Sequence, residues 1–338
     1  MIESSSFRSV FVRVFNTQEE YNLYHYRREL RRTANGMGIF LLISFLLEIV
    51  LSVVTLVVRS IGTPYAELIE DTLGTMIESG LISTLIFFFV SLVYAIIKRA
   101  DFSALFPFCK TSAGTIALFV IVGLTVTLMA NYVSDMVTAV FGMFGADNSV
   151  EMSYAVDSPL SVILYFFTVA VIPALVEEFA FRGVILGSLR KYSDALAVVV
   201  SAGLFALMHG NFVQIPFAFI GGLVFGFVVV KTNSLLPSII IHFLNNGLSV
   251  LLDVLSNNGD GAFYGTNLFW NLLLLLLVLV SAVLIAVITR RKPELLRFSD
   301  SDNVIAYRQK LGTVCSSPGI IAFAAVMLVY AVYVLMGV

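Results

Sequence analysis

Long apolar stretches separated by short polar ones run through the whole chain. Nine of these stretches approach the ~20 residues that an α-helix needs to cross a hydrocarbon core of ~30 Å. The pattern therefore predicts an all-α fold, a polytopic transmembrane helix bundle with about nine spans. The two longest connections, residues 134–158 and 290–318, are predicted to be loops. The predicted spans cover residues 38–58, 81–97, 114–134, 159–176, 195–209, 213–230, 236–254, 268–289 and 319–337.

The basic residues alternate with these spans and predict their orientation. When the connections are counted from the N-terminus, 19 of the 20 Lys and Arg residues fall on one side of the membrane, and only Arg59 falls on the other. Lys and Arg gather in the cytoplasmic connections of membrane proteins. We therefore expect an N-in/C-out topology with a predominantly acidic outer side.

The residues before the first span are basic and rich in aromatic groups. We expect residues 1–36 to form a cytoplasmic or interfacial segment, followed by a multi-span membrane domain over residues 37–338. The stretch Phe7–Phe15 alternates large apolar groups with Arg8 and Arg13, which suits the surface of an anionic leaflet, although a solvated tail fits it equally well. This segment does not have the pattern of a cleavable signal peptide.

Composition and charge exclude several other classes of protein. Of the 338 residues, 59% are hydrophobic and 12% are charged, and the mean hydropathy is +0.97, whereas soluble chains carry about 25% charged residues. A soluble enzyme, a disulfide-rich secreted scaffold and a disordered chain are excluded. The net charge of -2 leaves no basic surplus for binding nucleic acid. The high apolar content instead indicates that the protein is surrounded by membrane lipid. Cys109 and Cys315 fall on the predicted cytoplasmic side and are expected to be free thiols.

A few ionisable and polar residues interrupt the apolar spans. Because such groups are costly inside a membrane and usually face a cavity or a partner, each is a candidate functional residue. Glu48 lies ten residues into the first predicted span. The others gather at the fourth, fifth and seventh spans: Glu177, Glu178, His209, His242, Asn245 and Asn246.

Two adjacent glutamates end the fourth predicted span. Glu178 and Arg182 are four residues apart, so they share a helical face, with the glutamate on the favoured N-terminal side. Glu177 is turned about 100° away and has no local partner. The spacing predicts an ion pair between Glu178 and Arg182 and leaves Glu177 free for chemistry; the alternative is that both glutamates cap the helix end. Pro173 is expected to kink the helix one turn earlier.

The fifth span places an aromatic ring and an imidazole on one face. Phe205 and His209 are four residues apart. If the fourth and fifth helices turn near Ser193, Glu177 and His209 each lie 16 residues from the turn, or about 24 Å along their helices, and so at the same depth. Taken alone, His209 also fits a capping role at the end of a span.

The seventh span carries His242 and Asn246, again four residues apart. Two hydrogen-bonding groups one turn apart in an apolar helix are expected to face the bundle interior, either as a site or as a structural pair that bridges helices. A carboxylate, two imidazoles and an amide in one cavity suit hydrolysis in which the carboxylate activates water and the other groups hold the oxyanion. The sequence has no His-Glu-x-x-His, no Gly-x-Ser-Gly and no paired intramembrane aspartates.

Together these three elements resemble the CAAX prenyl-protease type II and bacteriocin-processing (CPBP, or Abi) family of intramembrane proteases. The family pattern is Glu-Glu-x-x-x-Arg, then Phe-x-x-x-His, then His-x-x-x-Asn or Asp, on successive core helices. The resemblance covers residues 159–254 and implies a protease core there. The matching residues are Glu177, Glu178 and Arg182; Phe205 and His209; and His242 and Asn246.

The resemblance implies a role for each of these residues. Glu177 and His209 are expected to activate water. His242 and Asn246 are expected to form the oxyanion site. Participation of a divalent metal such as zinc stays open, because Glu177, His209 and His242 carry suitable ligand atoms. Three further residues are expected to support the site: Glu178, Arg182 and Phe205.

We therefore expect an intramembrane endopeptidase of a bacterial-type plasma membrane that cleaves a peptide or membrane-protein substrate, near the cytoplasmic leaflet. One alternative is a non-catalytic membrane protein of the same fold, such as an immunity or chaperone-like partner. Another is a proton-coupled transporter, which is disfavoured because the polar groups cluster on three neighbouring spans and no matching interrupted helix is found in another half.

Overall fold

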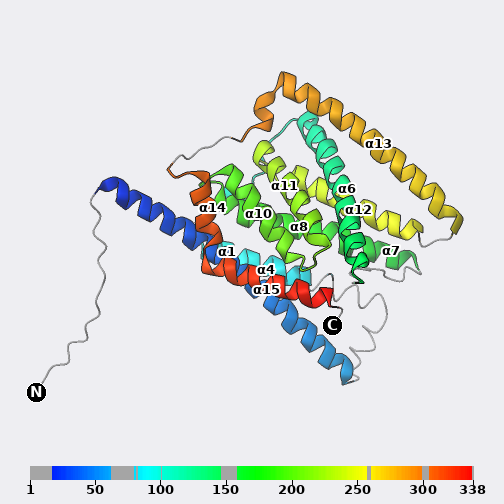
Figure 1. The fold of residues 1–338 in the computed structure, drawn as a ribbon, viewed down its shortest axis with the longest axis horizontal. Helices are drawn as coiled ribbons and strands as arrows, with labels where there is room; N and C mark the ends of the chain where they lie inside the picture. Colours follow the sequence, from blue (N-terminus) through cyan, green and yellow to red (C-terminus); the bar gives the residue numbers. More distant parts are fainter. Residues whose placement is uncertain are drawn as a thin grey trace, which may run out of the picture.

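A computed structural model describes residues 17–61, 80, 83–99, 101–145, 158–256, 260–298 and 304–336. Over these residues the chain is almost entirely helical, which confirms the predicted all-α bundle (Figure 1). Within the same ranges β-pairing is limited to one isolated antiparallel bridge between Phe108 and Ser234. The stretch Phe7–Phe15, expected at the membrane surface, lies outside the described residues.

Apolar helices occupy all nine predicted spans. In the described part of the chain, two are shorter than a full span, α4 (Ser83–Ile97) and α10 (Asp194–Met208). Neither length nor composition fixes the orientation of the helices, so the N-in/C-out topology stays a prediction. Among the described residues, seven helices are long and apolar enough to cross a membrane: α1 (Gln18–Ser60), α6 (Ala113–Met143), the continuous helix over Pro159–Leu189, α11 (Gln214–Thr232), α12 (Leu236–Ser256), α13 (Asp260–Arg291) and α15 (Pro318–Leu335).

The first helix begins twenty residues before the predicted span. The described part of the expected N-terminal segment is thus helical and continuous with α1, and its place at the membrane surface or in the cytoplasm stays a prediction. Leu30, Ala34 and Met37 are fully buried, so this extension has an apolar face of its own. Beyond it, α15 lies alongside α1 (Figure 1). A β-carbon at Gly38 would lie 2.1 Å from the carbonyl carbon of Gly319, so this crossing requires glycine.

Both of the connections predicted to be loops are partly helical. Helix α6 continues to Met143, well past the predicted end of its span at residue 134. The connection 290–318 contains a 3-10 helix, η4 (Pro293–Leu296), and a short helix, α14 (Tyr307–Cys315). The sequence of α14 is polar and does not predict burial, yet its Lys310 is only 3% exposed. The buried Nζ of Lys310 is accommodated by a hydrogen bond that it donates to the carbonyl oxygen of Tyr192 at 2.7 Å.

The fourth span is a composite of α-helical and π-helical turns. It runs through α7 (Pro159–Phe166), η2 (Phe167–Val171), α8 (Ile172–Glu177), η3 (Glu178–Leu186) and α9 (Gly187–Leu189), where η2 and η3 are π-helical. Pro173, expected to kink the helix, stands directly after η2 at the start of α8. A π-helical turn accommodates a residue that lacks the backbone donor, so the helix passes Pro173 without ending.

The centre and the periphery of the bundle differ in their surfaces. Helices α10 and α11 form the central hairpin and contact η3, α6 and α12 (Figure 1). Helix α13 lies at the edge and exposes large apolar side chains such as Leu272, Leu276 and Leu279, as expected of a lipid-facing helix. Cys109 and Cys315 are both free thiols, as predicted, and both are exposed.

Candidate active site

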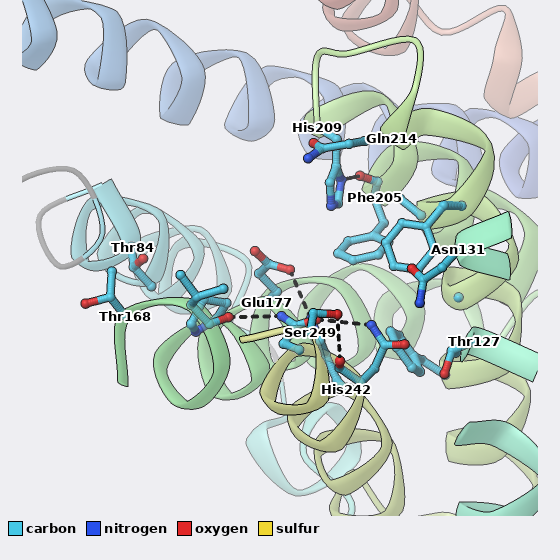
Figure 2. Close-up of a pocket in the computed structure, with 18 of the residues that line it drawn as sticks. Thr84, Thr127, Asn131, Thr168, Glu177, Phe205, His209, Gln214, His242 and Ser249 are labelled. Atoms are coloured by element: carbon cyan, nitrogen blue, oxygen red, sulfur yellow. Dashed lines mark hydrogen bonds and ion pairs between the residues drawn. The ribbon is translucent and has the colours of Figure 1, made fainter. Parts of the chain in front are cut away.

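The four residues expected to be catalytic line one cavity of about 490 Å³ (Figure 2). Glu177 ends α8, His209 caps the C-terminus of α10, and His242 and Asn246 lie one turn apart on α12. Much of the remaining polar lining is neutral. It comes from α4, α6, α11 and α12: Thr84, Thr127, Asn131, Gln214 and Ser249.

Glu177 is the glutamate that the cavity can reach. Its side chain is 29% exposed, whereas that of Glu178 is fully buried. Oε2 of Glu177 lies 3.7 Å from Nε2 of His242. The pairing of residues 65 positions apart is produced by the packing of α12 against α8, and it places a carboxylate and an imidazole side by side in the cavity.

The predicted ion pair between Glu178 and Arg182 is present. Nη1 of Arg182 lies 3.0 Å from Oε1 of Glu178, and both side chains are 0% exposed. The guanidinium also lies over the rings of Phe205 and Phe225, with its central carbon 4.4 Å and 4.9 Å from the ring centroids. This pair therefore lies in the core of the bundle, and the alternative in which both glutamates cap the helix end is wrong, because the helix continues as η3.

His242 is held by Glu178 and by an aromatic ring. Its Nδ1 is 3.1 Å from Oε1 of Glu178, and because a carboxylate only accepts, Nδ1 carries the hydrogen. The imidazole stacks on Phe225, with 5.0 Å between centroids and 15° between planes. These contacts fix the ring so that Nε2 is directed toward Glu177.

His209 is held in a similar way by the backbone of its own helix. Nδ1 lies 2.9 Å from the carbonyl oxygen of Phe205, so Nδ1 donates, and the neutral imidazole keeps a lone pair on Nε2 (Figure 2). The rings of Phe205 and His209 also meet edge to face, 4.8 Å apart. Gly210 follows with φ of 60°, a left-handed conformation that ends α10 directly after His209.

Asn246 is anchored to the π-helical turn η2. Its Nδ2 donates to the carbonyl oxygen of Val169 at 3.1 Å, and its Oδ1 accepts from Nδ2 of Asn245 at 3.3 Å. One hydrogen on Nδ2 of Asn246 therefore stays available to the cavity. Single π-helical turns within α-helices often lie at functional sites.

Sequence reasoning listed Asn245 as a polar interruption of its span but gave it no role, and it did not identify Asn131 or Gln214, although all three line the cavity. Asn245 is 3% exposed, lines the cavity, and has a buried Oδ1 for which the described residues provide no hydrogen-bond partner. It interrupts the same span as His242, but at a spacing of three residues that the motif does not include. Asn131 on α6 and Gln214 at the start of α11 stand alone in apolar surroundings, and no spacing links them to the other groups.

The three residues with suitable metal-ligand atoms do not form a metal site in this arrangement. Glu177, His209 and His242 all lie within the described ranges, and in those ranges no group of three or more His, Cys, Asp or Glu side chains converges closely enough to hold a metal ion. Nδ1 of each histidine is engaged by an oxygen acceptor. Each histidine thus has only Nε2 left as a possible ligand atom, and a role for zinc stays a prediction.

Comparison with known proteins points to the same part of the chain. Residues 159–248 match the family model of type II CAAX prenyl endopeptidase Rce1-like proteins. The chain is also 33% identical over 131 residues to the membrane-embedded CAAX protease MroQ of Staphylococcus aureus (strain USA300), an alignment that covers 37% of this chain and 52% of MroQ. The chain thus spans about half the length of this curated relative. No solved structure matches.

The matched stretch contains every residue that the motifs identified, from Glu177 to Asn246. The long apolar helices and the bacterial relative described as membrane-embedded together indicate a multi-pass protein of the cell membrane. This chain is therefore a multi-pass membrane protein whose residues 159–248 are similar to the Rce1-like type II CAAX prenyl endopeptidases, and which is similar over 131 residues to the membrane-embedded CAAX protease MroQ.

Proposed function

We propose that this protein is an intramembrane endopeptidase that hydrolyses a peptide bond in or near the membrane with an activated water molecule. The observation that carries the proposal is the orientation of the two histidines. Each has its Nδ1 held by an oxygen acceptor, so Nε2 of each is left for the cavity that Glu177 also lines. An arrangement of fixed imidazoles around an accessible carboxylate suits proton transfer.

Glu177 and His209 are the proposed water-activating pair. A water molecule donates one hydrogen to Nε2 of His209 and loses the other to the carboxylate of Glu177 as its oxygen attacks the substrate carbonyl. The proton held by Glu177 then passes to the leaving nitrogen as the carbon–nitrogen bond breaks. The products are a new carboxyl terminus and a new amino terminus, and Glu177 returns to its starting form.

His242 and Asn246 are the proposed oxyanion donors. Nδ1 of His242 donates to Glu178, so Nε2 can donate as well only when the ring carries a proton on both nitrogens. Glu178 faces Nδ1 and Glu177 faces Nε2, so each nitrogen has a carboxylate opposite it. The free hydrogen on Nδ2 of Asn246 supplies the second donor. Fixed donors aimed at a developing negative charge act strongly in a water-poor site.

The similarity to MroQ and to the Rce1-like family supports a protease, and the membrane setting supports peptide or membrane-protein substrates embedded in lipid. With the predicted N-in/C-out topology, cleavage would occur near the cytoplasmic leaflet. Purified protein in liposomes, incubated with a peptide library and analysed by mass spectrometry for new termini, tests the proposal. Reproducible cleavage is expected. Absence of cleavage across the library would favour the non-catalytic protein of the same fold.

Asn246→Ala is expected to slow cleavage without abolishing it. Loss of one oxyanion donor typically lowers the rate by ~10² to 10³, while Glu177 and His209 remain in place to activate water. The measurement is kcat for one cleaved peptide, compared between the wild type and the variant. Ser249→Ala is a suitable control, because Ser249 lies one turn along the same helix wall and has no proposed role. A wild-type kcat for Asn246→Ala would remove this residue from the oxyanion site.

A further inference from the structure

A second, smaller chamber of about 210 Å³ adjoins the main cavity. It shares four lining residues with that cavity, Thr84, Glu177, Phe205 and His209, so the two spaces meet at the proposed water-activating pair. A side chain in the smaller chamber would belong to a substrate residue next to the bond that is cleaved. The rest of its lining comes from α1, α4, η3 and α10: Glu48, Phe87, Phe181 and Met208.

Glu48 is the unusual member of this lining. It stands inside the first span, on a helix outside the stretch that matches the family model. Its neighbours Leu47 and Ile49 are 42% and 41% exposed, as lipid-facing residues are, whereas Glu48 lines the chamber. Within the described ranges, no ion pair or hydrogen bond joins its carboxyl group to another residue. An ionisable group at this depth is a candidate for ligand binding.

The walls of the chamber are aromatic. The rings of Phe87 and Phe181 have centroids 5.5 Å apart, and those of Phe181 and Phe205 are 5.1 Å apart. The faces of such rings attract cations, most strongly where water is excluded. The lining contains two acidic residues, Glu48 and Glu177, and no Lys or Arg, so it is complementary to a positive charge.

The core of the same protein shows how it holds a cation. Arg182 is enclosed by one carboxylate, that of Glu178, and by the rings of Phe205 and Phe225. The chamber presents the same chemistry with Glu48 and a set of phenylalanine rings, but around an open space. Arg182 is fully buried and paired with Glu178, and it does not line the chamber. At ~30 Å³ for one water molecule, the space accommodates a long side chain.

We propose that this chamber is a substrate subsite for a lysine or arginine side chain adjacent to the cleaved bond, and that Glu48 determines this preference. The inference rests on the proposed function, because it assigns the chamber to a peptide substrate. It adds a substrate class, a peptide with a basic residue beside the cleavage site, that neither the family match nor the relative specifies. The neutral amides of the main cavity would contact other parts of the substrate chain.

The test is a cleavage-site profile of a peptide library in liposomes, measured by mass spectrometry with wild-type protein, Glu48→Gln and Glu48→Lys. We expect Lys and Arg to be enriched over Leu and Gln at one position next to the cleaved bond, by on the order of 10-fold, as for one desolvated charge pair. Glu48→Gln should remove most of this enrichment, and Glu48→Lys should shift it toward Asp and Glu.

The controls separate this inference from the proposed function. Glu294→Gln removes an exposed carboxylate on η4 and should keep the wild-type profile. Phe87→Leu keeps the carboxyl group but removes one aromatic wall, and should reduce the basic preference even if Glu48→Lys fails to fold. A wild-type profile without a basic preference, or the same preference in Glu48→Gln, would overturn the subsite while leaving the protease intact. Cleavage that persists in Glu177→Gln would instead overturn the proposed function.

Discussion

Glu177→Gln is expected to reduce peptide cleavage to the limit of detection while the protein still folds and inserts. Glutamine keeps the size of the side chain and can still hydrogen-bond, but it cannot take a proton from water. General acid–base catalysis contributes a factor of ~10² to 10⁴ to the rate. In the proposed step no other carboxylate accepts the proton of the attacking water, so nothing replaces Glu177 as the base. Because Glu177 is partly exposed to the cavity, unlike Glu178, the neutral replacement should cost little stability. Initial rates for a cleaved peptide measure the effect.

The matched control is Glu294→Gln, which makes the same chemical change on exposed η4. It should retain the wild-type rate and the wild-type elution volume in size-exclusion chromatography. If Glu177→Gln cleaved at the wild-type rate while Glu178→Gln remained folded but was inactive, the assignment of the two glutamates would have to be reversed.

Glu178→Ala is expected to act first on stability. The substitution removes the carboxylate that pairs with Arg182 at 3.0 Å and leaves a fully buried guanidinium without that partner. Removing one partner of a buried ion pair typically costs ~3–5 kcal/mol. The rings of Phe205 and Phe225 remain and offset only part of this loss. We expect a low yield of folded protein and a lower unfolding temperature in detergent micelles.

Two further variants separate the structural role of Glu178 from its contact with His242. Arg182→Met leaves Glu178 with a neutralising contact, since His242 still donates to it at 3.1 Å, so the loss of stability should be smaller. The double variant Glu178→Leu/Arg182→Met removes both charges and should recover much of the stability, because a buried pair can often be replaced by apolar groups. It should still cleave slowly, because His242 loses the acceptor that orients its ring. Full activity of the double variant would show that this contact is dispensable.

Local sequence patterns predicted much of the fold and part of the site. Hydropathy located all nine apolar helices, because a span has to be apolar over nearly its whole length. The spacing of four residues predicted the pair between Glu178 and Arg182, which depends on one helix alone. Equal distances from the turn near Ser193 placed Glu177 and His209 at the same depth, and both line the same cavity.

Other features depend on contacts between distant segments and have no local signature. The bond between His242 and Glu178 joins residues 64 positions apart. The π-helical turns before and after α8 change the hydrogen-bonding register without a characteristic residue pattern. The start of α1 at Gln18 was missed because its extension is polar on the outside and is stabilised by packing. The chamber beside Glu48 is likewise formed by four separate helices.

Cleavage in water enriched in oxygen-18 tests the central claim most directly. Wild-type protein in liposomes, the Glu177→Gln variant and a peptide that the wild type cleaves are compared under identical conditions, and the products are weighed by mass spectrometry. If Glu177 activates water for attack on a peptide bond, the wild type produces a new carboxyl terminus that carries oxygen-18, and the variant produces no such product. Equal amounts of labelled product from both proteins would contradict the account.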